Sequence, residues 1–422
     1  MAQRVQPVRG MHDILPEDGL RHRHVVDTAR RVAGLYGYQP IATPIVEPTA
    51  VFQRTLGETS DIVSKEMYSF DDRGGESLTL RPEGTAGVAR AFITAGLAQA
   101  TPCKFFYDGP MFRYERPQKG RQRQFHQVGV ELIGAPEPEG DAEVVAMGAR
   151  FLEALALQGN TVLHLNSLGD AESRGAYRAA LVDFLRPKAD RLSEDSRLRL
   201  ERNPLRILDS KDEGDRALIA DAPRYDAYLN QDSRDFFAAV RRDLDRLGIA
   251  YEVDPKLVRG LDYYVHTAFE FVSDALGAQA TVLAGGRYDG LIAAMGGPET
   301  PGVGWAAGVE RLAMLCAAPP APRRPVTVVP VSDGEHGHAL ALADRLRAAG
   351  LPVDVGFRGN LKKRMKHANR VGARAALILG EDEVARGVAK LRDLDTGAEE
   401  DVALDRLAAA CAALLAGGGP GA

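Results

Sequence analysis

A stretch of alternating apolar and polar residues, Gly109 to Gly134, limits the possible fold more than any other part of the chain. Its second half predicts a strand, because successive side chains in a strand point to opposite faces. Val128, Val130 and Leu132 share one face, which we expect to be core. The opposite face carries an unusual set for a sheet surface: Phe125, Gln127, Gly129 and Glu131.

The first half of this stretch predicts a second strand, which carries Arg113 and Glu115 on one face and leads into a basic loop. Acids, amides and arginines on one face suit a small polar ligand that carries phosphate. The pattern alone is equally compatible with a surface hairpin whose charges are solvated. The basic residues of the loop are Arg116, Lys119, Arg121 and Arg123.

Length and composition indicate a globular protein of two or three domains. The chain has 422 residues, of which 45% are hydrophobic and 26% charged, and its net charge is −5. A nucleic-acid partner would therefore have to meet a local basic patch. We expect no signal peptide and no membrane span, because no apolar run reaches about 18 residues. Three widely spaced cysteines indicate a reducing compartment, so we expect a cytoplasmic protein.

A segment rich in proline and alanine at 317–325 predicts a domain boundary. Beyond it, strand and helix patterns alternate, which predicts a small α/β domain over residues 326–422. Residues 358–374 of this domain carry seven basic side chains and no acid. Such a run suits the phosphate backbone of a nucleic acid, although it is more often a solvated helix face.

Residues 1–320 mix strand and helix patterns, except for a segment at about 170–250 that has helical spacing and predicts a helical insertion. A hairpin over 66–81 runs into Glu83 and Thr85 at the start of a helix. Binding groups often occupy such a junction, but a simple helix cap is the alternative. Glycines at 302–308 do not fit a dinucleotide-binding fingerprint, because the third glycine comes one residue late.

Several segments recur in one known family. Residues 109–131 and 302–311 are similar to the second and third motifs of class II aminoacyl-tRNA synthetases, and the stretch around Pro44 is similar to the first, a dimer-interface motif. The chain also contains three segments that match the histidine members of the class: TLRPEGT at 79–85, LVRGLDYY at 257–264 and AGGRYDGL at 284–291. Over nearly its whole length the chain therefore resembles the histidyl-tRNA synthetase family. Trp305 departs from the pattern, which more usually has a smaller aromatic there.

The resemblance implies an α+β fold: an antiparallel sheet flanked by helices, a helical insertion and a C-terminal α/β anticodon-binding domain. It also implies a histidine–tRNA ligase that activates L-histidine with ATP, giving histidyl-adenylate and pyrophosphate. The histidyl group then passes to the 3′ end of histidine tRNA. A homodimer that uses Mg²⁺ is implied as well, with unknown metal ligands.

The resemblance assigns the chemistry to arginines. The α-carboxyl group of histidine has a pKa of about 3.5, so it is ionised at neutral pH and needs no general base. Catalysis must then come from positioning and charge stabilisation at the phosphoryl group. Arg113 and Arg259 would hold the α-phosphate as the catalytic pair. The expected ATP-binding residues are Arg113, Glu115 at the adenine edge, Arg121 and Arg311 at the outer phosphates, and Phe125, which with Arg311 would sandwich the adenine.

The remaining assignments concern histidine and tRNA. The expected histidine pocket comprises Glu83, Thr85 and Gln127 at the α-amino group, with Glu131, Tyr263 and Tyr264 around the imidazole. A pocket that hydrogen-bonds both ring nitrogens discriminates by about 10⁴–10⁵, so no editing domain is needed. The expected tRNA contacts are Gln118 near the acceptor end, and Lys362, Lys363 and Arg364 near the anticodon.

Two alternatives remain. A regulatory subunit of ATP phosphoribosyltransferase resembles the catalytic domain, but it normally lacks the C-terminal domain and loses catalytic residues. Arg113, Arg259 and Arg311 are all present here. The other alternative is a nucleotide-binding or RNA-binding protein without aminoacylation, against which the histidine-specific segments argue.

Overall fold

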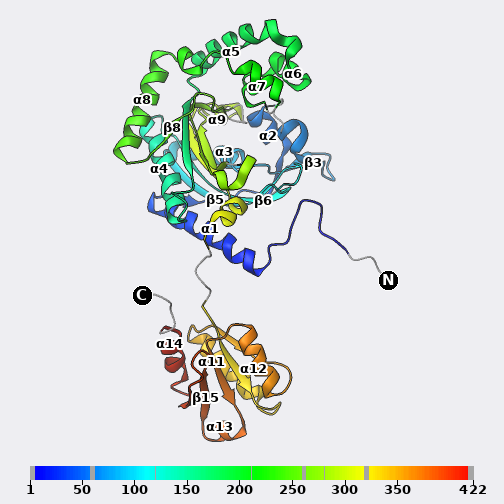
Figure 1. The fold of residues 1–422 in the computed structure, drawn as a ribbon, viewed down its shortest axis with the longest axis vertical. Helices are drawn as coiled ribbons and strands as arrows, with labels where there is room; N and C mark the ends of the chain where they lie inside the picture. Colours follow the sequence, from blue (N-terminus) through cyan, green and yellow to red (C-terminus); the bar gives the residue numbers. More distant parts are fainter. Residues whose placement is uncertain are drawn as a thin grey trace. The chain divides into compact units, whose positions relative to one another are not determined.

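The computed structural model describes residues 5–57, 62–118, 120–210, 212–258, 263–279, 281–317 and 323–416. The chain forms two compact units, which divide at Pro319 and Pro320 within the proline-rich segment (Figure 1). Within the described residues, none of the helices combines the length and the apolar character that a bilayer crossing requires.

An eight-stranded sheet forms the centre of the first unit, in the order β1-β5-β6-β11-β10-β9-β7-β8. The edge strands β1 and β8 pair in parallel with their neighbours, and all the other pairs are antiparallel. This confirms the predicted antiparallel sheet flanked by helices. Its strands are β1 (Gln39–Pro40), β5 (Cys103–Phe112), β6 (Gln124–Ile133), β7 (Val162–Ser167), β8 (Glu252–Val253), β9 (Val265–Val272), β10 (Thr281–Arg287) and β11 (Gly302–Gly308).

One face of this sheet packs against helices α1 (Pro16–Leu35), α4 (Pro138–Ala154), α8 (Gln231–Arg246) and α10 (Val309–Leu315). Val128, Val130 and Leu132 lie in this core, which confirms the predicted apolar face of β6. Trp305 belongs to it as well. Its indole Nε1 donates to the carbonyl of Val144 at 3.1 Å, and its ring stacks on Phe151. The unusual tryptophan therefore packs in this core, and it also borders the cavity on the polar side of the sheet.

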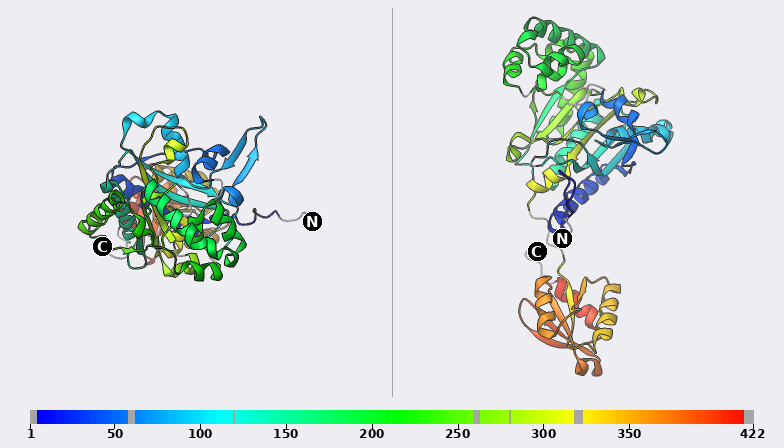
Figure 2. Two further views of the ribbon diagram at one scale, coloured as in Figure 1. Left: turned by 90° about the horizontal axis from the view of Figure 1, so that it is seen from above. Right: turned by 90° about the vertical axis from the view of Figure 1, so that its right-hand side faces the viewer.

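The polar face of the sheet meets α3 (Thr85–Thr94) and α9 (Leu291–Ala294), and α2 (Thr49–Leu56) packs against both helices. A small sheet, β2-β4-β3, stands beside them and contains the predicted hairpin as β3 (Tyr68–Asp71) and β4 (Ser77–Leu80), with β2 (Val46–Pro48). The predicted insertion consists of α5 (Ala171–Leu185), α6 (Glu194–Arg202) and α7 (Glu213–Ile219) with short 3₁₀ turns, and it leads into α8. Its helices gather at one end of the unit (Figure 2).

The second unit is a five-stranded sheet in the order β13-β12-β14-β15-β16. Its first three strands are parallel, and β15 and β16 add antiparallel pairs. The sequence did not predict β16, because its acidic, exposed residues lack an apolar alternation. The elements are β12 (Val326–Pro330), α11 (His336–Ala348), β13 (Val353–Val355), α12 (Leu361–Arg370), β14 (Ala375–Leu379), α13 (Glu381–Ala385), β15 (Val388–Asp393), β16 (Glu399–Ala403) and α14 (Leu407–Ala416).

Candidate active site

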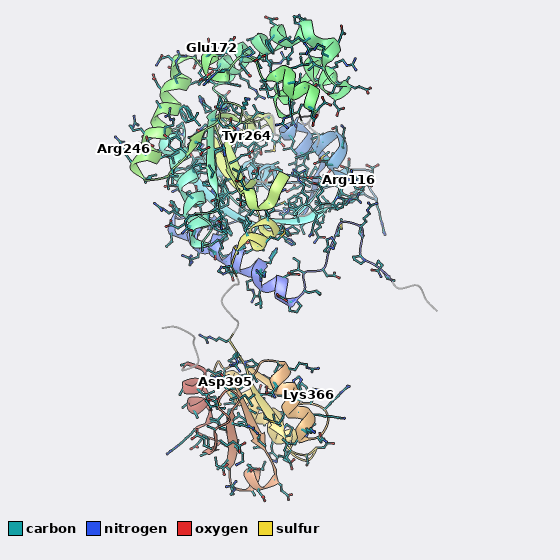
Figure 3. All side chains as sticks on the ribbon, viewed as in Figure 1. Arg116, Glu172, Arg246, Tyr264, Lys366 and Asp395 are labelled. Carbon is teal, nitrogen blue, oxygen red and sulfur yellow. The ribbon has the colours of Figure 1, made fainter. Side chains whose placement is uncertain are left out.

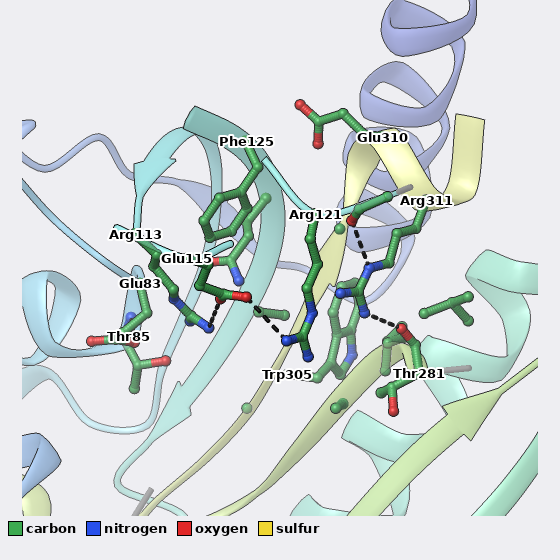
Figure 4. A pocket seen from close by; sticks show the side chains of 18 of the residues that line it. Glu83, Thr85, Arg113, Glu115, Arg121, Phe125, Thr281, Trp305, Glu310 and Arg311 are labelled. Carbon is green, nitrogen blue, oxygen red and sulfur yellow. Dashed lines mark hydrogen bonds and ion pairs between the residues drawn. The ribbon is translucent and has the colours of Figure 1, made fainter. Parts of the chain in front are cut away.

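A cavity of about 230 Å³ opens on the polar face of the large sheet, where β6, β10 and β11 meet the loop that follows β5 (Figure 4). Most of the side chains selected from the sequence lie in its wall, although they come from five separate segments. This shared cavity is a stronger result than any single motif, because the sequence does not specify which segments meet. The predicted residues in the wall are Glu83, Thr85, Arg113, Glu115, Arg121, Phe125, Gln127, Tyr263, Tyr264 and Arg311.

Arg113 and Glu115 lie beyond the end of β5, so the prediction that they share a strand face is wrong. The Arg113 N–H still donates to Arg123 in the β5–β6 register, but the next N–H donates to Glu66, so Glu115 lies outside the ladder. The two side chains still converge on the cavity, where a guanidinium nitrogen of Arg113 lies 3.8 Å from a carboxylate oxygen of Glu115. Arg113 is fixed by a 2.9 Å bond from Nε to the Pro82 carbonyl.

Arg121 and Arg311 enter one end of the cavity, and Arg113 lies on the other side of Glu115, beside Glu83 and Thr85 (Figure 4). Arg121 pairs with Glu115 at 3.0 Å. Arg311 donates from Nε to the Gly120 carbonyl at 3.1 Å and from Nη1 to the Thr281 carbonyl at 2.6 Å. Burial lowers the pKa of Arg311, and the nearby cation of Arg121 lowers this pKa further. The concentration of positive charge suits a polyanion such as a triphosphate.

At the other end, Glu131 is buried behind the wall with only 1% of its surface exposed. The hydroxyls of Thr85, at 2.7 Å, and Tyr288 each donate to one of its carboxylate oxygens. Burial raises the pKa of Glu131 to about 8, although both hydrogen bonds act in the opposite direction. Gly304 lies against the same carboxylate, and a Cβ there would be 2.0 Å from Oε2. This packing gives the glycine-rich segment a steric role beside a buried acid.

Tyr288 is a residue that the sequence analysis did not assign to the site. It stands within AGGRYDGL, a segment already singled out, so that segment was the available signal. Its contact with Glu131 joins residues 157 positions apart, which no local pattern reveals.

Glu83 combines the two alternatives that its position in the sequence left open. Its carboxylate accepts hydrogen bonds from the backbone N–H groups of Thr85 and Ala86, at 2.7 and 2.9 Å, so it caps α3. It also lines the cavity, and burial raises its pKa. A helix cap and a binding residue are therefore compatible at this junction.

Gln127 carries the clearest sign of a missing partner. Its carbonyl oxygen is buried and has no hydrogen-bond partner among the residues that the structure describes. Leaving a buried acceptor unpaired costs about 1–3 kcal/mol, so the wall is suited to a ligand that brings a donor to this point. The α-amino group of an amino acid is such a donor.

Tyr264 lies inside the first unit, where its ring is 4.5 Å from that of Tyr263 (Figure 3). Tyr263 in turn meets the edge of Tyr288 at 5.8 Å, so the aromatic side chains form one wall of the pocket. Arg259 lies outside the described residues and its role stays a prediction. The same holds for Lys119.

Two of the expected tRNA contacts on α12, Lys362 and Lys363, are exposed, but Arg364 is not. Arg364 is only 1% exposed, and its guanidinium bonds the Pro330 carbonyl at 2.7 Å and the Asp333 carboxylate at 2.6 Å. Its assignment to tRNA binding is therefore wrong, because it holds α12 onto β12 and the loop that follows.

A hollow beside α12 gathers other basic side chains (Figure 3 labels Lys366 on this helix). Phe357 stands in it with 66% of its surface exposed, which is unusual for a phenylalanine. In the first unit, Gln118 is exposed at a tight turn that two backbone bonds to Arg121 close. The hollow is lined by Gly356, Phe357, Arg358, Lys363, Lys366, His367, Asn369 and Arg370.

Comparison with known proteins agrees with this arrangement. A model of the family described as histidyl-tRNA synthetase matches residues 10–312. The chain belongs to the histidyl-tRNA synthetase family. A model of the anticodon-binding domain matches residues 325–414, so both units of this synthetase family member are covered. The resemblance noted in the sequence is thereby confirmed.

Curated relatives of this synthetase family extend over almost the entire chain. The histidine–tRNA ligase of Rhodospirillum rubrum is 64% identical over 402 residues, which are 95% of this chain and 97% of that protein. The histidine–tRNA ligase of Gluconacetobacter diazotrophicus is 62% identical over 401 residues, with the same coverage.

Solved structures give the same picture. Apo histidyl-tRNA synthetase of S. aureus is 36% identical, has a TM-score of 0.81, and the match covers 96% of this chain and 99% of that one. A Bacillus halodurans protein described as an ATP phosphoribosyltransferase regulatory subunit/histidyl-tRNA synthetase has a TM-score of 0.64 at 22% identity, covering 89% of this chain and 99% of that one. That second likeness concerns the fold alone.

Proposed function

We propose that the chain is an ATP-dependent histidine–tRNA ligase of protein biosynthesis. In the first step a histidine carboxylate oxygen attacks the α-phosphorus of ATP, the bond to pyrophosphate breaks, and histidyl-adenylate forms. In the second step a ribose hydroxyl at the 3′ end of tRNA attacks the histidyl carbonyl and AMP leaves. The observation that carries this proposal is one cavity that joins arginine side chains to a polar wall of Glu83, Thr85 and Gln127, in a member of this family.

The arginine-rich end suits ATP because its cations are held by partners that phosphate can replace. Arg311 bonds two neutral carbonyls, and Arg121 bonds an acid at the cavity wall. Phosphate oxygens form stronger, charge-assisted hydrogen bonds with guanidinium groups than carbonyls do. Arg113, fixed by Pro82, is positioned to meet the α-phosphate, with Arg259 as its expected partner. The Phe125 ring, 5.4 Å from the Arg113 guanidinium, offers a flat surface for adenine.

The polar end suits histidine. The unpaired oxygen of Gln127, with Glu83 and Thr85 nearby, would receive the α-amino group. Glu131 and Tyr264 would hydrogen-bond the imidazole nitrogens. Because Glu131 is buried, an amino acid without a ring nitrogen would form no hydrogen bond with it beyond those from Thr85 and Tyr288, and such a site rejects the wrong substrate.

The cavity also fits a magnesium ion, which prefers carboxylate and phosphate oxygens. Glu83 and Glu310 already accept backbone N–H bonds, whereas the ion pairs of Glu115 are with arginine side chains. Glu115 would therefore hold Mg²⁺ together with ATP. When bound, the ion supplies positive charge that stabilises the phosphate oxygens.

Glu115→Gln should then raise the Mg²⁺ concentration required for activity. An unchanged requirement with a raised KM for ATP would instead place Glu115 at the adenine edge.

The second unit would bind the anticodon region of the tRNA. Lys362 and Lys363 are exposed cations, and Phe357 offers an exposed ring on which a splayed base can stack. Gln118, at its exposed turn beside the cavity, would meet the acceptor end. These local contacts would bind tRNA although the net charge of the chain is −5.

We expect a homodimer in the cytoplasm. The stretch around Pro44 places Ile45 at the surface with 42% exposure, directly before β2, an edge strand of the small sheet, as suits an interface. Ile45→Asp should shift the sedimentation coefficient to that of a monomer, and an unchanged value would argue against this interface.

The cytoplasm is a reducing compartment, which suits the buried free thiols of Cys103, Cys316 and Cys411.

Histidine-dependent exchange of labelled pyrophosphate into ATP tests the proposed activity directly. The full chain should catalyse exchange with histidine and not with other amino acids. Addition of histidine tRNA should then yield histidyl-tRNA. Well-folded protein that shows no exchange would contradict the proposal, and exchange without charging would limit the chain to histidine activation.

A further inference from the structure

A second cluster of chemistry-bearing side chains stands apart from the arginine-rich cavity. His22 comes from α1, His126 from the start of β6 and Glu310 from the first turn of α10. One nitrogen of each imidazole and one carboxylate oxygen all lie within 4.8 Å of one another. Three elements distant in sequence therefore bring two imidazoles and one carboxylate to a single point.

Two of these residues, His126 and Glu310, bond each other, whereas one ring nitrogen of His22 has no partner among the described residues. Glu310 accepts from the backbone N–H of His126 at 3.0 Å and lies 2.8 Å from its Nδ1. His22 meets the ring of His126 edge-on, with centroids 4.5 Å apart. Its Nε2 is buried and has no hydrogen-bond partner among the described residues. A buried imidazole nitrogen without a partner is an available lone pair or donor, on a residue that already stands in the cluster.

The surroundings favour a cation. A cavity of about 570 Å³ borders the cluster and gives solvent access to it. Asp13 and Asp18 line this cavity together with Glu310, against one cation, Arg21. The local field is therefore negative, and the open side leaves room for a water ligand.

We propose that His22, His126 and Glu310 form a binding site for a divalent transition-metal ion of the Zn²⁺ type. Two imidazoles and one carboxylate with an open fourth position are a donor set that zinc accepts. Ligand atoms around a tetrahedral zinc ion lie about 3.3 Å apart. Side-chain rotations that move the ligand atoms by roughly 1 Å therefore bring the observed cluster to the spacing of a bound ion. Neutral His126 would move its proton from the ligating nitrogen to the other one.

This site differs from the one proposed for Mg²⁺. Magnesium prefers oxygen ligands and keeps several waters, whereas imidazole nitrogen favours zinc, nickel and copper. The cluster also lies on the far side of Glu310 from the arginines, because Glu310 borders both cavities while His22 and His126 line only the second. Metal binding here is thus separable from ATP binding.

The test titrates the full chain, stripped with EDTA, with Zn²⁺ alone by calorimetry and with Co²⁺ by visible absorption. We expect one strong site per chain and the intense bands of a tetrahedral Co²⁺ complex. His22→Gln should weaken Zn²⁺ binding by more than about 100-fold, because loss of a ligand exceeds the loss from an outer-shell partner. His24→Gln is the matched control: His24 lies two residues further along α1, so it points to another face and should bind Zn²⁺ normally.

Absence of saturable binding by the unmodified chain would overturn the proposal, and so would a His22→Gln protein that binds as tightly as the parent. Weakening by His24→Gln instead would also overturn it. Circular dichroism checks that each variant folds. His22→Phe, which keeps a ring against His126, provides a second variant in case the glutamine disturbs packing. Binding to scattered surface histidines would survive both changes and would count against the site.

Discussion

The arginine-rich cavity and the surface of α12 use charge in opposite ways. In the cavity, Arg113 and Arg311 are held in place by specific backbone carbonyls. On α12, Lys362 and Lys363 stand in solvent. Fixed charges in a confined site act strongly and individually, whereas exposed charges are screened and act through their sum. Single substitutions should therefore have large effects in the cavity and small ones on the helix.

Arg113→Met should produce the largest effect. Loss of one positioned donor at the phosphoryl group lowers kcat by about 10²–10³, and the KM for histidine should change little. Pyrophosphate exchange under saturating substrates measures the loss. Arg116→Met, an exposed arginine three residues further on, is the control and should retain exchange. Comparable losses in both variants would show that general charge, and not position, is responsible.

Glu131→Gln should raise the KM for histidine by about 2–10-fold, because Glu131 keeps its proton below about pH 8 and an ordinary hydrogen bond contributes about 0.5–1.5 kcal/mol. The KM for ATP should stay nearly constant, since Glu131 lies at the other end of the cavity. Exchange measured across both substrates separates the two effects. A raised KM for ATP alone would remove Glu131 from the histidine pocket.

The same substitution should change how stability depends on pH. The carboxyl of Glu131 loses its proton near pH 4.5 in the unfolded chain but only near pH 8 in the folded one. Between these values the folded state binds more protons, so this group makes the free energy of unfolding fall as pH rises. Glu131→Gln removes that dependence and should stabilise the chain at pH 8.5 more than at pH 5, by a few kcal/mol at ~1.4 kcal/mol per unit of pKa. Thermal melts at both values test it, with exposed Glu139→Gln as the control.

Phe357→Ala should weaken binding of histidine tRNA by roughly fivefold or more, since a stacked base contributes at least about 1 kcal/mol. Leu340→Ala, which removes another exposed apolar side chain in the same unit, should have no effect. Filter binding at fixed salt measures both. Equal affinities for the two variants would exclude base stacking on this ring.

Lys362→Ala and Lys363→Ala should have the smallest effects. Each lost phosphate contact reduces the salt dependence of tRNA binding by about 0.7–0.9 in log–log slope. Arg364→Met sharpens the contrast: it should lower the melting temperature of the second unit without altering that slope, because Arg364 bonds protein carbonyls. A changed salt dependence of tRNA binding for Arg364→Met would show that Arg364 does contact the tRNA.

Side-chain positions that depend on the local strand period could be predicted from the sequence. Positions that depend on contacts between distant segments could not. Alternation placed Val130 in the core and Glu131 on the polar face, and both are confirmed. The residues after Arg113 could not be placed, because the chain leaves the β5–β6 ladder there and the next N–H donates to Glu66, a residue far away in the sequence.

Arg364 could have been recognised from the sequence. Ala368 follows it by one helical turn and is fully buried, so both lie on the inward stripe of α12. Counting basic residues in the segment ignored this spacing. The partner of Glu131, in contrast, required the fold, because Tyr288 arrives from a strand and turn far along the chain.

Two glycines set a limit on changing the amino-acid specificity of this cavity. Any side chain at Gly304 would collide with Glu131, and a Cβ at Gly129 would lie 2.3 Å from the ring of Tyr107. Libraries that diversify the floor of the pocket would therefore mostly yield misfolded proteins. An engineer who wants the enzyme to accept a histidine analogue should keep both glycines and vary the tyrosine wall instead.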